Sequence, residues 1–104
     1  MNKSRIEFDI EMDENQVPES INWKAGADGE GEARAIMLSI WDSKDQNTLR
    51  IDLWNKEMTK EEMKQFFHQT ILTLTDSFEK ATDDKRIADG VRMFCEDLKG
   101  QLNI

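Results

Sequence analysis

The residue types that carry most enzyme and metal chemistry are scarce in this chain. It has one histidine, His68, and one cysteine, Cys95. A structural zinc site of the usual type needs four such ligands, so it cannot be assembled from these two. Both residues fall on or beside the apolar stripes of predicted helices, which favours a boundary histidine and a small buried cysteine over a general base and a nucleophile. We therefore predict no catalytic residue, no metal site and no cofactor.

The segment GADGEGE, residues 26–32, combines three glycines with three carboxylates. A phosphate-binding loop needs free backbone N–H groups and a nearby lysine, whereas Asp28, Glu30 and Glu32 would repel the anion. The ligand spacing of a calcium-binding hand is also missing. We predict an exposed loop, and weak binding of a divalent cation is the alternative that these carboxylates leave open.

Length and charge limit the remaining classes of function. With 104 residues the chain is expected to form a single domain, residues 1–104. Its net charge of −8 disfavours nucleic acid and anionic membrane surfaces as partners. The N-terminal residues show no signal-peptide pattern, and the longest apolar run, AIML, is too short for membrane insertion. We expect a cytoplasmic protein, which the lone cysteine also fits.

Alternation of apolar and polar residues predicts strands in the first half of the chain. The pattern is clear over residues 5–12, 20–25 and 48–54. Residues 33–41 are ambiguous, since they fit a helix as well as a strand. We choose a strand there because residues 42–47 resemble a hairpin loop that leads directly into the strand at 48–54.

The second half predicts two amphipathic helices. Thr59 and Glu62 form a capping-box pattern at the start of the first helix. Apolar residues then recur every three or four positions as far as Ala81, and a second stripe runs from Ile87 to Leu98, with Gly100 near its end. The expected fold is therefore α+β, with a four-stranded antiparallel sheet and two C-terminal amphipathic helices packed on one face.

A group of large side chains is expected on the face of the sheet that points away from the helices. If Leu49, Ile51 and Leu53 face the helices, then the opposite face carries five residues with the composition of an interface anchor. These predicted partner-binding residues are Met37, Trp41, Arg50, Asp52 and Trp54. A competing interpretation is that Trp54 folds under a loop or covers the start of the first helix.

The run from Ile51 to Thr70 resembles the GldC family of gliding-motility-associated proteins of the Bacteroidetes. The resemblance is carried by IDLW, then K-x-M, then MKQFFHQT, with MLSIWDSK and IEFDIEMDENQVPESINW before them. Asn55 departs from the family pattern, in which a threonine is expected after the tryptophan. The resemblance implies a small cytoplasmic accessory protein of the gliding apparatus, with no enzyme activity and no cofactor.

Two functional hypotheses follow. The first is an interaction module whose tryptophans dock a protein of the motility machinery or a second copy of this chain. The second is a small-molecule-binding protein or enzyme with a pocket between sheet and helices and His68 at its edge.

Overall fold

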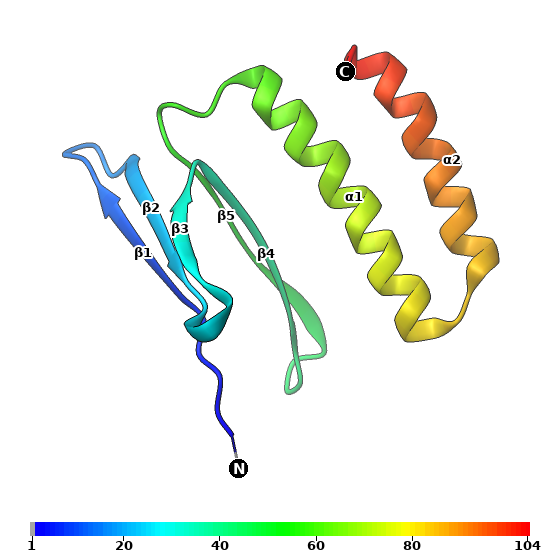
Figure 1. Cartoon of the computed structure of the whole chain (residues 1–104), viewed down its shortest axis with the longest axis horizontal. Helices are drawn as coiled ribbons and strands as arrows, with labels where there is room; N and C mark the ends of the chain where they lie inside the picture. The colour runs from blue at the N-terminus through cyan, green and yellow to red at the C-terminus, as the bar shows by residue number, and fades with distance from the viewer. Residues whose placement is uncertain (1) are drawn as a thin grey trace. The chain divides into compact units, whose positions relative to one another are not determined.

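The computed structural model describes residues 2–104 as five strands and two long helices (Figure 1). The chain divides into two compact units, one ending at Met58 and the other formed by Thr59–Ile104. The first unit contains the strands and the second contains the helices. The predicted α+β class, with strands preceding helices, is confirmed.

The first three strands form an antiparallel sheet with β2 in the middle. They are β1 (Glu7–Met12), β2 (Pro18–Lys24) and β3 (Glu30–Ala33). The strands predicted at 5–12 and 20–25 are thus confirmed as β1 and β2. Ile21 pairs with Ile10 on one side and Ala33 on the other, and only 1% of its surface is exposed. Because side chains alternate along a strand, the apolar residues of β1 lie on the same face of the sheet as Ile21, and the carboxylates of β1 lie on the opposite face.

A side-chain turn connects β1 to β2. The Asp13 carboxylate accepts hydrogen bonds from the backbone N–H groups of Asn15 (2.8 Å) and Val17 (2.9 Å). Gln16 adopts the left-handed conformation with φ 62°, which tightens the turn. Lys56, from the end of the unit, places its ammonium 2.5 Å from Asp13 and lowers the pKa of this carboxyl, mainly through that hydrogen bond.

The expectation of an exposed loop over residues 26–32 is correct for exposure, since residues 26–30 and 32 are exposed, but it is wrong for the backbone, which forms regular structure. Gly26–Asp28 form a short 3-10 helix, and Glu30–Ala33 form β3, which pairs with β2. Gly31 lies opposite Trp23, and a Cβ at this position would approach the indole Nε1 to 3.0 Å. The glycine therefore serves close packing of the Trp23 ring rather than loop flexibility.

The prediction of one four-stranded sheet is also wrong. The structure has a second, two-stranded sheet made of β4 (Ala35–Asp42) and β5 (Asn47–Trp54). A bend at Arg34 separates β3 from β4, and the Arg34 carbonyl accepts a hydrogen bond from the Asn55 N–H at 2.8 Å. The chain thus leaves the first sheet at this bend and begins the second, as strands do when they change sheets. Residues 33–41 are extended rather than helical, which confirms the choice of a strand.

Two antiparallel helices make up the second unit (Figure 1). They are α1 (Lys60–Thr82) and α2 (Lys85–Leu102). The predicted capping box is confirmed: Thr59 Oγ1 accepts from the Glu62 N–H at 3.0 Å, and Glu62 Oε1 accepts from the Thr59 N–H at 3.1 Å. α2 runs past Gly100 to Leu102, and Asn103, in the left-handed conformation, caps its C-terminus. The expected packing of these helices on a sheet stays a prediction.

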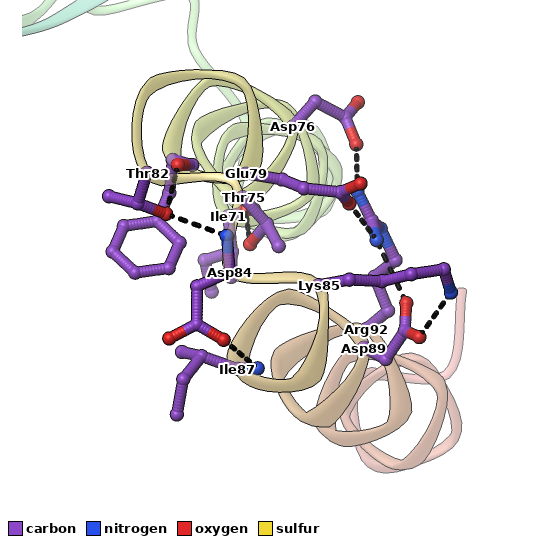
Figure 2. A network of polar contacts seen from close by, with 11 residues as sticks. Ile71, Thr75, Asp76, Glu79, Thr82, Asp84, Lys85, Ile87, Asp89 and Arg92 are labelled. Carbon is purple, nitrogen blue, oxygen red and sulfur yellow. Dashed lines mark hydrogen bonds and ion pairs between the residues drawn. The ribbon is translucent and has the colours of Figure 1, made fainter.

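A cluster of ion pairs, which the sequence analysis did not predict, joins the two helices (Figure 2). The Arg92 guanidinium of α2 lies 2.8 Å from Asp76 and 2.7 Å from Glu79 on α1. Within α2, the Asp89 carboxylate forms ion pairs with Arg92 at 3.0 Å and with Lys85 at 2.6 Å. The hydrogen bonds that Arg92 donates to Asp76 and Glu79 raise the pKa of the guanidinium, and these charge-assisted contacts join the two helices.

This cluster should make the stability of the helical unit depend on pH. The hydrogen bond from Lys85, followed by that from Arg92, lowers the pKa of Asp89 below its ordinary value of 3.8. A carboxylate with a depressed pKa contributes stability above its ordinary pKa, and this contribution is lost as the pH falls through the folded-state value. The stability difference between the wild type and Asp89→Asn should therefore be largest near neutral pH and shrink in acid. Thermal unfolding followed by far-ultraviolet circular dichroism would measure it, and a difference that does not change with pH would contradict the assignment.

Candidate functional site

The hairpin of β4 and β5 positions the residues that the sequence analysis nominated. Its strands pair in an unbroken antiparallel register from Ala35 opposite Trp54 to Asp42 opposite Asn47. Directly opposed residues point to the same side of an antiparallel pair. The register therefore sorts the side chains of the hairpin into two faces.

One side, here called the aliphatic face, carries three opposed apolar pairs. They are Ile36 with Leu53, Leu38 with Ile51, and Ile40 with Leu49. This is the face that the alternation of Leu49, Ile51 and Leu53 predicts.

The opposite side, here called the tryptophan face, brings all five predicted residues together. Its four opposed pairs are Trp41 with Thr48, Ser39 with Arg50, Met37 with Asp52, and Ala35 with Trp54. Trp41 is 65% exposed and Trp54 is 55% exposed, while Met37 is half-buried. The tryptophans lie at opposite ends of this face, roughly 20 Å apart along the strands, given about 3.4 Å per residue.

An ion pair occupies the middle of the tryptophan face. Arg50 donates from Nε to Asp52 Oδ2 at 3.1 Å and from Nη2 to Asp52 Oδ1 at 2.7 Å. It also donates from Nη1 to the Ser39 hydroxyl. The hydrogen bond with Asp52 raises the pKa of Arg50. Because the two charges neutralise each other, the centre of this face can be covered without burying an unpaired charge.

The two residues considered for chemistry both lie in the helical unit. Cys95 is 1% exposed, which confirms the prediction of a small buried side chain. His68 is half-buried, as a boundary residue should be, and its Nε2 lies 2.9 Å from the backbone carbonyl oxygen of Cys95. Each residue thus has a structural role in joining α1 to α2.

Two further properties concern residues 2–104 as a whole. No group of three histidine, cysteine or carboxylate side chains in this range is arranged to hold a metal ion. Neither helix of these residues combines the length and the apolar content required to cross a bilayer.

A protein-family model matches most of the chain. The family model described as gliding motility-associated protein GldC-like matches residues 18–104, so that residues 1–17, which include β1, lie outside the match. No curated protein and no solved structure matches the chain. The match includes the hairpin of the tryptophan face and both helices, and the chain therefore belongs to the GldC-like family of gliding motility-associated proteins.

Proposed function

We propose that this protein is a non-enzymatic, cytoplasmic accessory protein of gliding motility that acts by binding another protein through its tryptophan face. Membership of the GldC-like family supports the link to motility. The observation that carries the mode of action is the exposure of Trp41 and Trp54 on a strand face whose central charges are already paired.

The composition of the tryptophan face is that of a binding surface. Tryptophan and arginine dominate the residues whose truncation costs the most affinity in protein interfaces. Trp41, Trp54 and Met37 supply apolar area, and Arg50 with Asp52 supplies directional polar contacts.

The residues of the helical unit support a role without chemistry. A cysteine nucleophile must reach its substrate, whereas the thiol of Cys95 is almost fully covered. A general base must contact the proton that it removes, whereas the His68 Nε2 lies against a backbone carbonyl. The thiol is thus buried, and the imidazole is occupied in a contact between the helices.

The test compares affinity capture by the wild type and by the Trp41→Ser/Trp54→Ser variant from native extract of the cells that express the protein. The wild type should retain a specific partner. The amount of that partner captured by the variant should be at least about tenfold lower, since each interface tryptophan commonly contributes about 2 kcal/mol. Met93→Ser is the matched control, because Met93 is 73% exposed but belongs to α2 of the helical unit and not to the hairpin. This control should capture as the wild type does.

Circular dichroism must show that all variants are folded. Capture of the same partner by the wild type and by the folded double-tryptophan variant would overturn the proposal.

A further inference from the structure

We propose that the tryptophan face binds a second copy of this chain, so that two hairpins stack face to face about a two-fold axis. The inference rests on the proposed function and names the partner of the same surface. It is carried by the order of side chains along the four opposed pairs, which is self-complementary when one copy is turned end over end.

A symmetric dimer imposes a strict condition on the surface that forms it. In a two-fold interface each residue contacts the symmetry-related position, so a patch must complement itself. For two stacked hairpins, consider an axis that lies between the faces, runs across the strands and passes through the centre of the face. This axis reverses the order of the four opposed pairs, so the first pair meets the partner's fourth pair and the second meets the partner's third.

At the ends of the tryptophan face this arrangement places large side chains over small ones. Trp41 would cover the partner's Ala35, and Trp54 would cover the partner's Thr48. Each indole then fills the space left by a short side chain, at a separation between facing sheets of about 10 Å. Four aromatic contacts of this kind would be made in one dimer, because each copy supplies both tryptophans.

In the centre the same arrangement places opposite charges together. Arg50 would face the partner's Asp52, and Ser39 would face the partner's Met37. Each Arg50 already binds the Asp52 of its own chain at 2.7 Å, so the four groups would form a ring of alternating charge. Alternating charges with satisfied hydrogen bonds can be buried at low cost, whereas an isolated charge cannot.

The charges distinguish this axis from the other face-to-face arrangement. An axis parallel to the strands would also set the tryptophans over small residues, with Trp41 over the partner's Thr48. However, it would place Asp52 over the partner's Met37 and would bring no arginine directly over an aspartate. Charge complementarity therefore selects the axis across the strands.

The size of the face indicates a reversible dimer. A stable interface commonly buries about 800 Å² on each partner, and two strands of eight residues offer less than this. The net charge of −8 on each copy adds a long-range repulsion, which physiological salt screens. Dimerisation should therefore depend on protein concentration and become weaker at low ionic strength.

Charge reversal tests the proposal directly. Arg50→Asp alone would gather four carboxylates at the centre of a dimer, and Asp52→Arg alone would gather four guanidinium groups. Sedimentation velocity should show a dimer for the wild type and at least about a tenfold weaker self-association for each single variant, given the cost of like charges in contact. An equimolar mixture of the two single variants should restore the dimer, because each position 50 then faces an opposite charge at position 52.

The Arg50→Asp/Asp52→Arg double variant guards against misfolding. It keeps a pair within each chain and complementary charges across the axis, so it should dimerise as the wild type does. A wild type that stays monomeric at every concentration, or single variants that fail to recover when mixed although both are folded, would overturn the second-copy inference. If the chain does not dimerise but the wild type captures another protein that the Trp41→Ser/Trp54→Ser variant does not, the proposed function stands without the dimer. If tryptophan replacement changes no association at all, the proposed function fails as well.

Discussion

Replacing Ile21 by alanine should lower the free energy of unfolding of the strand unit by about 2–4 kcal/mol, the usual cost of truncating a buried aliphatic side chain. Ile21 is 1% exposed and lies between Ile10 of β1 and Ala33 of β3. The cavity would open at the central strand of the sheet, where neighbours on both sides lose contacts. A change of this size is a large fraction of the stability of a small domain.

Tryptophan fluorescence during urea unfolding would measure this effect selectively. The chain has three tryptophans, Trp23, Trp41 and Trp54, and all of them precede the helical unit. Ile21→Val should cost only about 0.5–1.5 kcal/mol. Ile6→Ala, at a position that is 67% exposed, is the surface control and should change stability by less than about 0.5 kcal/mol. Equal losses for Ile21→Ala and Ile6→Ala would show that Ile21 is not the centre of the core.

Asn55→Ala should destabilise the strand unit by about 1–3 kcal/mol, because it removes the side-chain acceptor of two backbone N–H groups and leaves the Met58 N–H with the weaker bond to the Asn55 carbonyl oxygen at 3.3 Å. Asn55 is 7% exposed, and its Oδ1 accepts hydrogen bonds from the N–H groups of Glu57 and Met58, each at 3.1 Å. The same residue ties the end of the hairpin to Arg34 through its backbone. It therefore fixes the turn that follows Trp54.

The matched control for this position keeps the acceptor. Asn55→Asp retains an oxygen in the same place and should preserve most of the stability, since both residue types form this side-chain turn. Urea unfolding followed by fluorescence compares the variants, with Glu57→Ala as an exposed neighbour. If Asn55→Ala and Asn55→Asp lose equal stability, the hydrogen bonds of the side chain are not the source of its effect.

The elements with strong local patterns could be predicted from the sequence. Strict alternation identified β1 and β5, and the loop at 42–47 settled the ambiguous segment as β4. The reciprocal hydrogen bonds of Thr59 and Glu62 are local, so the start of α1 was also predictable. Each of these features depends on residues that are close together in the chain.

The features that depend on distant residues could not be predicted in the same way. β3 is rich in glycine and glutamate, which have low strand propensity, and its role becomes clear only when Trp23 is seen opposite Gly31. The division into two sheets arises at the bend at Arg34, a position that has no glycine or proline to predict a turn. Arg92 lies sixteen positions from Asp76 in the sequence, so the ion pair between them forms only when α1 and α2 have packed against each other.

The candidate site is an intermediate case. Alternation, together with the choice of a strand for residues 33–41, was sufficient to predict that Met37, Trp41 and Trp54 share a face with Arg50 and Asp52. The register of β4 and β5 places them on one face. The bidentate geometry of the Arg50 and Asp52 pair required the structure. Self-complementarity of the face likewise required the pairing of each residue across the hairpin.

The most direct test of the central claim, that another protein covers the tryptophan face, is hydroxyl-radical footprinting of the captured complex and of the isolated protein in dilute solution. The oxidation rates of Trp41 and Trp54 would be measured by mass spectrometry, with the exposed Met93 of α2 as an internal reference. We expect both tryptophans to oxidise more slowly in the complex while Met93 reacts at the same rate in both samples. Equal oxidation of Trp41 and Trp54 in the two samples would contradict the account.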